Sequence, residues 1–408
     1  MADSDGLPVR SITGAVVATT VGVLPLFLLG GLAVFVGEEL RFGDAELGAA
    51  VGAYYLSSAV SSVPAGRLAE RIGGDRAMLL GGAASTLALL IVAILARDWA
   101  GLLLAMLLGG LGNALAQLGA NLALARTVPK HRQGLAFGLK QAAIPVATLL
   151  GGLAVPLVGL TVGWRWAFAV APVLFLVLLS VAPRSGEHPV RRPGSLRAGD
   201  VSLAPLAVLA LAAALGSASV NALGAFFVKS AVSSGLDVGS SGLVLAVASV
   251  TGIVGRVWSG HRADQREGGH LAQVALLMIV GGMAMGLLVF SEVHVLLVLG
   301  SVVAFGAGWG WNGLFTYAIV RRNPNAPAAA TGITQLGLFA GGMVGPLVFG
   351  ATAEASSFAA AWLGAAVALM VGAVLILVGR RMLLQDVAVR EAAASGAASP
   401  ETVAALDR

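Results

Sequence analysis

The sequence predicts an all-α membrane protein with twelve transmembrane helices in two pseudo-symmetric halves of six. The first observation is composition: of 408 residues, 58% are hydrophobic and 11% charged, and the mean hydropathy is +0.91. A soluble domain has roughly 25% charged residues, so we expect this chain in a lipid bilayer. The second is that the apolar runs are continuous, which is typical of helices of ~20 residues rather than of alternating transmembrane strands. The third is an internal repeat.

The apolar runs give the elements in order. The first half, residues 1–182, contains six runs, at 11–36, 46–66, 77–96, 100–124, 134–157 and 163–182. A stretch rich in Pro, Gly, Ser and Arg, residues 183–202, is the predicted linker. The second half, residues 203–379, contains six more, at 203–228, 239–259, 271–290, 294–319, 329–352 and 357–379, and a polar tail covers 380–408.

The basic residues are distributed unequally between the two sets of loops. With both termini on one side, 19 of the 25 Lys and Arg residues fall in the loops and tails of that side. The opposite loops hold only Arg41, Arg97, Arg165 and Lys229. Positive charge is enriched in cytoplasmic loops, so we expect both termini and the linker in the cytoplasm. The N-terminus lacks the basic region of a signal peptide, and the high Arg and Ala content favours a bacterial plasma membrane protein.

The internal repeat relates residues 194 positions apart. Gly66-Arg-Leu-Ala-Glu70 follows the second apolar run, and Gly260-His-Arg-Ala-Asp264 follows the eighth. Gly138-Leu-Lys-Gln141 in the fifth run has the same offset from Gly332-Ile-Thr-Gln335 in the eleventh. A shared offset at two unrelated places indicates duplication. Parallel halves of this kind are a known transporter plan, with the substrate site between them.

With twelve runs, a central linker and this loop sequence, nearly the whole chain resembles the major facilitator superfamily. The family's loop pattern Gly-x-Leu-Ala-Asp-Arg-x-Gly is read here from Gly66 to Gly73, with Glu70 in place of Asp and Gly74-Asp75 where basic residues are usual. The resemblance implies secondary transport by alternating access. It also implies a cytoplasmic gate, for which the candidate residues are Gly66, Arg67, Glu70, Arg71, Gly260 and Asp264. The alternative interpretation is a solvated loop whose charges only set topology.

Two cations lie well inside the apolar runs, Arg256 in the eighth and Lys140 in the fifth. Charge at a helix centre costs about 2.5–3.5 kcal/mol on insertion scales, so such residues are candidates for function; snorkelling to the headgroups is the alternative. Their repeat-mates Ser62 and Thr334 are uncharged, and the runs contain no clear acidic partner. A substrate anion would suit both cations, because the planar guanidinium pairs with carboxylates.

Arg256-Val-Trp-Ser-Gly260 is similar to an Arg-x-x-x-Gly pattern of the superfamily's organic-anion, monocarboxylate and cyanate-transporter-like branches, in which the arginine binds substrate. Further substrate candidates are polar or aromatic residues within the runs. Asn113, Gln117 and Asn121 form one helical stripe, and Tyr54, Trp311, Asn312 and Tyr317 lie in the second and tenth runs. Helix–helix hydrogen bonding and packing are the alternatives for these residues.

The function predicted is therefore secondary transport of a small carboxylate-like anion, with a coupled proton as a further candidate partner. Drug efflux by proton antiport is the alternative, although Met106 stands at the place of the usual arginine and Ile144 precedes Pro145 where exporters have glycine. A receptor or scaffold does not account for the central cations. We expect no enzyme activity, cofactor, metal site or nucleic-acid partner, and a monomer. Substrate identity, direction and coupling stay open.

Overall fold

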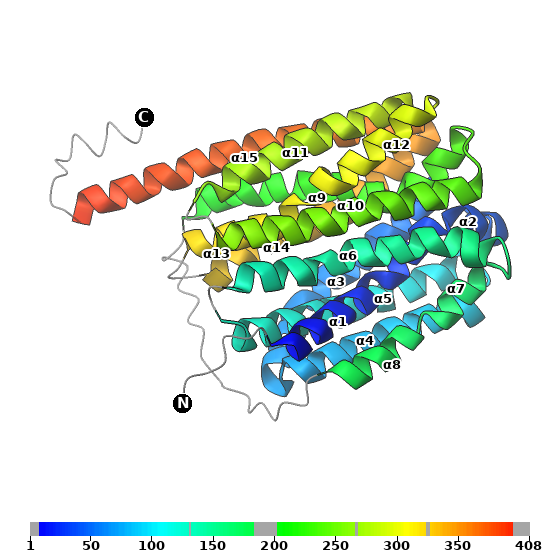
Figure 1. The fold of residues 1–408 in the computed structure, drawn as a ribbon, viewed down its shortest axis with the longest axis horizontal. Coiled ribbons are helices and arrows are strands. Elements are labelled where there is room, and N and C mark those ends of the chain that lie inside the picture. The colour runs from blue at the N-terminus through cyan, green and yellow to red at the C-terminus, as the bar shows by residue number, and fades with distance from the viewer. Residues whose placement is uncertain (1–7, 130–131, 183–201, 266–267, 324–326, 395–408) are drawn as a thin grey trace.

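The computed structural model describes residues 8–129, 132–182, 202–265, 268–323 and 327–394, and within these ranges the regular secondary structure is helical. Of the predicted linker, residues 183–201 lie outside the described residues, and of the predicted tail, residues 395–408 do. Figure 1 shows a bundle in which the helices of the first half occupy the lower part of the view and those of the second half the upper part.

Each half supplies six spans. In the first half they are α1 (Val9–Gly31) with α2 (Ala33–Leu40), α3 (Asp44–Ile72), α4 (Gly74–Leu90) with η1 (Ile91–Leu95), α5 (Trp99–Thr127), α6 (Gln133–Ala154) with η3 (Val155–Gly159), and α7 (Trp164–Val170) with α8 (Val173–Val181). In the second half they are α9 (Leu203–Ser233), α10 (Val238–Asp264), α11 (His270–Leu287) with η5 (Leu288–Phe290), α12 (His294–Val303) with η6 (Ala304–Gly308) and α13 (Trp311–Arg322), α14 (Pro327–Ala355) and α15 (Phe358–Ala394).

Eleven helical segments of the described chain are long and apolar enough to cross a membrane. The twelfth span is α3, whose 29 residues give a length of about 44 Å. It is more polar than the others because charged residues occupy both of its ends. The twelve predicted runs and the fold class are thus confirmed.

Several predicted runs differ in detail from the helices, and the tenth is interrupted by a turn at Trp309-Gly310. The first run breaks at Leu32 between α1 and α2, and the sixth breaks at Ala171-Pro172, where proline lacks the N–H that would continue the helical bonding. The last helix does not stop near residue 379 but continues to Ala394, and Figure 1 shows it projecting beyond the bundle. Residues after 380 are rich in Ala, Leu and Arg, which are strong helix formers.

Two pairs of helices make the most extensive contacts between the halves, α6 with α10 and α3 with α14. Small residues allow the close approach, as is usual for helices in lipid. A Cβ placed on Gly152 would come within 2.7 Å of the Gly242 carbonyl oxygen, and one on Gly260 within 2.7 Å of the Gly134 carbonyl oxygen. The antiparallel helices α6 and α10 are therefore in contact near both of their ends.

The contact between α3 and α14 lies towards one end of the bundle. Its close approaches run from Tyr55 against Gly342 to Gly43 against Glu354. We call this the far end, because α1 begins, α8 ends and α9 begins at the opposite end, which we call the linker end (Figure 1). The far end is thus closed along both helix pairs.

Candidate functional site

Two buried cations lie at the contact between the halves. Arg256 of α10 is 3% exposed and Lys140 of α6 is 2% exposed. Neither forms an ion pair with a described residue. The helices α1, α5, α6, α9 and α13 contain no Asp or Glu, and α10 has only its last residue, Asp264. The site therefore holds positive charge that described acidic side chains do not neutralise.

The Arg256 guanidinium is held by two backbone carbonyls. Its Nε donates to the Trp309 carbonyl oxygen at 3.0 Å and its Nη1 to the Gln141 carbonyl oxygen at 2.6 Å. The guanidinium carbon also lies 5.5 Å from the centroid of the Trp309 ring, a cation–π distance. These contacts tie α10 to both α6 and the turn before α13. Carbonyl oxygens orient the cation but carry no net charge to balance it.

Lys140 donates from Nζ to the side-chain oxygen of Gln117 on α5. One turn along α5, Asn113 donates to the Ser58 hydroxyl on α3 at 3.1 Å, and that hydroxyl donates to the Gly110 carbonyl at 2.9 Å. Asn113 is thus part of a helix–helix network, while its Oδ1 is buried without a partner among the described residues. Of the predicted polar stripe, the structure brings Gln117 to a cation and uses Asn113 in packing.

The two adjacent tyrosines of α3 have different surroundings. Tyr54, the predicted substrate contact, is fully buried and donates its hydroxyl to the Gly22 carbonyl of α1 at 2.7 Å. This bond joins α3 to α1, and the substrate contact of Tyr54 stays a prediction. Tyr55 instead crosses between the halves and donates to the Asn221 side chain on α9. Asn221 was not among the residues selected from the sequence, although a polar amide inside the apolar run 203–228 indicates a contact with another helix or a cavity.

The candidates on α13 also separate. Trp311 is fully buried against Gly216 of α9 and Phe315, and its substrate contact stays a prediction. Asn312 is half-buried, and its Oδ1 has no partner among the described residues. Tyr317 and Arg256 line the same small hollow, together with Gly138, Gly260, Gly313 and Leu314. Asn312 and Tyr317 therefore stay substrate candidates, together with Arg256.

The predicted gate residues lie at the linker end of α3 and α10. Arg67, Glu70 and Arg71 are exposed, and Glu70 forms no ion pair with a described residue. Gly66 comes near Leu118 of α5, where a Cβ would be 3.8 Å away from Cδ1. Gly260 packs against α6 as described above. Asp264 is the last residue of α10, and its side chain lies outside the described part.

At the far end, charged residues that sequence reasoning did not select join the halves. Lys229 of α9 forms an ion pair with Asp44 of α3 at 2.6 Å. Glu354 of α14 accepts the backbone N–H of Ala45 at 2.9 Å, so its carboxylate caps the N-terminus of α3, where the helix dipole favours negative charge. Their position at the ends of three apolar runs was a signal for an inter-helix role.

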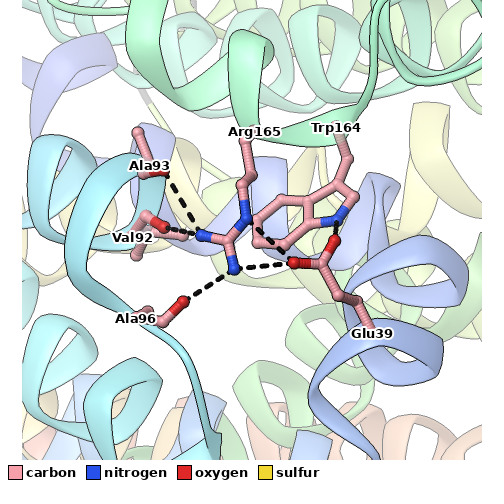
Figure 2. Close-up of polar contacts among 6 residues, drawn as sticks. All are labelled: Glu39, Val92, Ala93, Ala96, Trp164 and Arg165. Atoms are coloured by element: carbon pink, nitrogen blue, oxygen red, sulfur yellow. Dashed lines mark hydrogen bonds and ion pairs between the residues drawn. The ribbon is translucent and has the colours of Figure 1, made fainter.

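A second arginine network lies at the same end, within the first half (Figure 2). Arg165 bonds Glu39 Oε1 through Nη2 at 2.8 Å and the carbonyls of Val92, Ala93 and Ala96 at 3.0, 3.3 and 2.8 Å. Trp164 Nε1 donates to Glu39 Oε2 at 2.7 Å. Burial by itself raises the pKa of the Glu39 carboxyl, but these hydrogen bonds and the Arg165 charge outweigh it and hold the pKa below its usual value.

Comparison with known proteins agrees with this architecture. The profile of the Major Facilitator Superfamily matches residues 12–336. The uncharacterized MFS-type transporter EfpA of Mycobacterium tuberculosis is 29% identical over 315 residues, which are 74% of this chain and 57% of that protein. The uncharacterized MFS-type transporter Rv1250 of the same organism is 34% identical over 158 residues, 38% of this chain and 27% of that protein. The chain thus spans little more than half of the first relative's length.

Among solved structures, a bacterial homolog of the human lysosomal transporter Spinster, in an inward-facing and occupied conformation, superposes with a TM-score of 0.69. The superposition covers 94% of this chain and 99% of that chain, at 15% sequence identity. At this identity the likeness concerns the fold alone. It supports the assignment of α1–α8 and α9–α15 to the two halves of a twelve-helix membrane bundle.

Proposed function

Because the chain belongs to the major facilitator superfamily, a family of multi-pass membrane transporters rather than enzymes, we propose that it is a secondary transporter for a small carboxylate-like organic anion. The proposed route is alternating access, with the substrate held between the halves. The observation that carries the proposal is the pair Arg256 and Lys140, one from each half, buried without an acidic partner among the described residues.

The physical argument concerns charge balance. A cation in the interior of a membrane protein is usually paired, because the charge is expensive to remove from water. Here the Arg256 and Lys140 partners are two carbonyl oxygens and an amide oxygen, which are neutral. A bound carboxylate would supply the missing charge, and Arg256 would offer it a planar set of donors. Contact with both halves would then couple binding to their relative movement.

The test is uptake by purified protein in proteoliposomes. The probes are radiolabelled benzoate, lactate and pyruvate, with and without an imposed pH gradient. If a carboxylate is carried, Arg256→Ala removes a charge-assisted hydrogen-bond donor worth about 1.5–3 kcal/mol, so uptake at low substrate concentration should fall roughly 10- to 100-fold. Arg262→Ala is the matched control, because Arg262 is exposed on the same helix against Trp258.

Unchanged carboxylate uptake by a folded Arg256→Ala protein would contradict the proposal. Drug efflux by proton antiport, the alternative predicted from sequence, gives a different outcome. In inverted vesicles with an acidified lumen, added drug would then release protons and change the signal of a pH-sensitive dye, with or without carboxylate. The Arg256 variant would retain that activity. The response of uptake to the pH gradient shows whether a proton accompanies the anion.

A further inference from the structure

Pro145 leaves one carbonyl of α6 without its helical partner. In a regular α-helix the N–H of residue 145 would bond the carbonyl of residue 141, but proline has no N–H. Pro145 lies inside α6, between Gln133 and Ala154. The Gln141 carbonyl is therefore open to another donor. A buried carbonyl without a donor is destabilising, so the bundle needs a donor at this place.

Arg256 provides that donor from the opposite half. Its Nη1 lies 2.6 Å from the Gln141 carbonyl oxygen. The register of the helices favours this bond: one turn before Arg256, Gly252 packs on the proline, and a Cβ placed there would be 3.2 Å from Pro145 Cβ. In this antiparallel pair, Gly252 opposite Pro145 brings Arg256 opposite Gln141.

The second carbonyl bound by Arg256 is also outside a regular helix. Trp309 lies in the two-residue turn between η6 and α13, and Gly310 is the N-cap of α13. The carbonyl before an N-cap receives no bond from the helix that follows, so Trp309 can accept from Arg256 Nε at 3.0 Å. Two helix interruptions, one in each half, thus supply the two acceptors that fix the guanidinium.

We propose that Pro145 is a positioning residue for Arg256. By removing one helical hydrogen bond, it exposes the Gln141 carbonyl that, with the Trp309 carbonyl, orients the guanidinium. Nε and Nη1 are engaged in this way, and Nη2, which has no hydrogen-bond partner among the described residues, is left for the ligand. The orientation of the Arg256 guanidinium by Pro145 is inferred from these contacts alone. That the oriented guanidinium binds an anion rests on the proposed function.

The test is a double-mutant cycle that needs no substrate. Pro145→Ala restores an N–H for the Gln141 carbonyl, so Arg256→Met should lower the apparent melting temperature of the detergent-purified protein less in the Pro145→Ala background than in the natural one. We expect a difference of at least ~2 °C at a fixed scan rate. If the Met variant does not fold, Arg256→Lys replaces it in the cycle. Lysine keeps the charge but lacks the planar guanidinium that reaches both carbonyls.

The control cycle pairs Arg256→Met with Pro64→Ala, because Pro64 interrupts α3 and is exposed; these two effects should add. Equal losses from Arg256→Met with and without Pro145 would overturn the positioning role. A second measurement separates this proposal from the function: benzoate binding should weaken about tenfold in Pro145→Ala if Arg256 serves an anion. Coupling in the cycle together with no carboxylate binding by the natural protein would leave Pro145 as a positioning residue and refute the anion.

Discussion

Arg165 and Arg256 both donate to backbone carbonyls at places where regular helical hydrogen bonding stops. Arg165 bonds the carbonyls of Val92, Ala93 and Ala96 at the end of η1, and Arg256 bonds those of Gln141 and Trp309. The difference lies in charge: Arg165 has the carboxylate of Glu39, whereas Arg256 has no acidic partner among the described residues. An arginine with a purely structural role can have its charge balanced by a carboxylate of the protein, as Arg165 has. The lack of such a carboxylate at Arg256 favours a role in binding.

Glu39 gives a pH-dependent prediction at this scale. Its pKa is lowered in the folded protein, so its interactions stabilise the fold above the unfolded pKa, about 4.3, and this stability is lost as the pH falls through the folded pKa. Both side chains of the Glu39–Arg165 pair are partly exposed, so the contribution is small, up to about 1 kcal/mol.

We expect the melting temperature of Glu39→Gln to be lower than that of the natural protein at pH 7, with the gap narrowing at pH 4. Glu292→Gln is the control, since Glu292 is exposed and makes no hydrogen bond or ion pair with described residues. A gap of the same size at both pH values would show that the Glu39 charge does not stabilise the fold.

The sequence could locate the two buried cations but could not identify their partners. Lys140 and Arg256 stand out as charges in apolar runs, and the structure confirms that both are buried. The carbonyls of Gln141 and Trp309 carry no signal of their own, because their availability depends on a missing proline N–H and on a turn within the tenth span. Tyr54 and Tyr55 are adjacent in sequence, and only the rotation of α3 decides which one crosses to the other half.

At the scale of elements, α3 is joined to the second half by its N-terminal part. Glu354 accepts the Ala45 N–H, Lys229 pairs with Asp44, and Gly48 packs against the carbonyl of Pro346. The apolar runs predicted the existence of α3 and α14, and the repeat made α3 the equivalent of α10 and α14 the equivalent of α6. Periodicity contains no information on which ends touch, because that depends on the tilt of whole helices.

Glu354→Gln should loosen the far-end contact between α3 and α14. Loss of the negative charge weakens the cap on the α3 N-terminus. Because Glu354 is exposed, we expect the equilibrium between the closed and the open far end to shift only two- to fivefold, about 0.5–1 kcal/mol. The measurement is electron–electron resonance between spin labels at Glu38→Cys and Ser356→Cys, both exposed positions. The longer-distance population should grow in the variant; an unchanged distance distribution would contradict a far-end closing role for Glu354.

At the scale of the whole molecule, the charge asymmetry predicts how the bundle lies in the membrane. The structure places the linker end of every span on one side, since twelve crossings return the chain to where it began. The fold itself is indifferent to which side faces the cytoplasm. Orientation therefore rests on the 19 basic residues of one side against four on the other, an excess that retains the basic loops inside during insertion.

The chain has no cysteine, so single cysteines can report orientation without any prior substitution. Arg97→Cys places a thiol in the loop before α5 at the far end, and Arg262→Cys places one at the linker end of α10; both positions are exposed. A membrane-impermeant maleimide applied to intact cells should label Arg97→Cys and leave Arg262→Cys unlabelled, and inverted vesicles should give the reverse. Labelling of Arg262→Cys from outside intact cells would place the linker end outside and would contradict the cytoplasmic assignment of both termini.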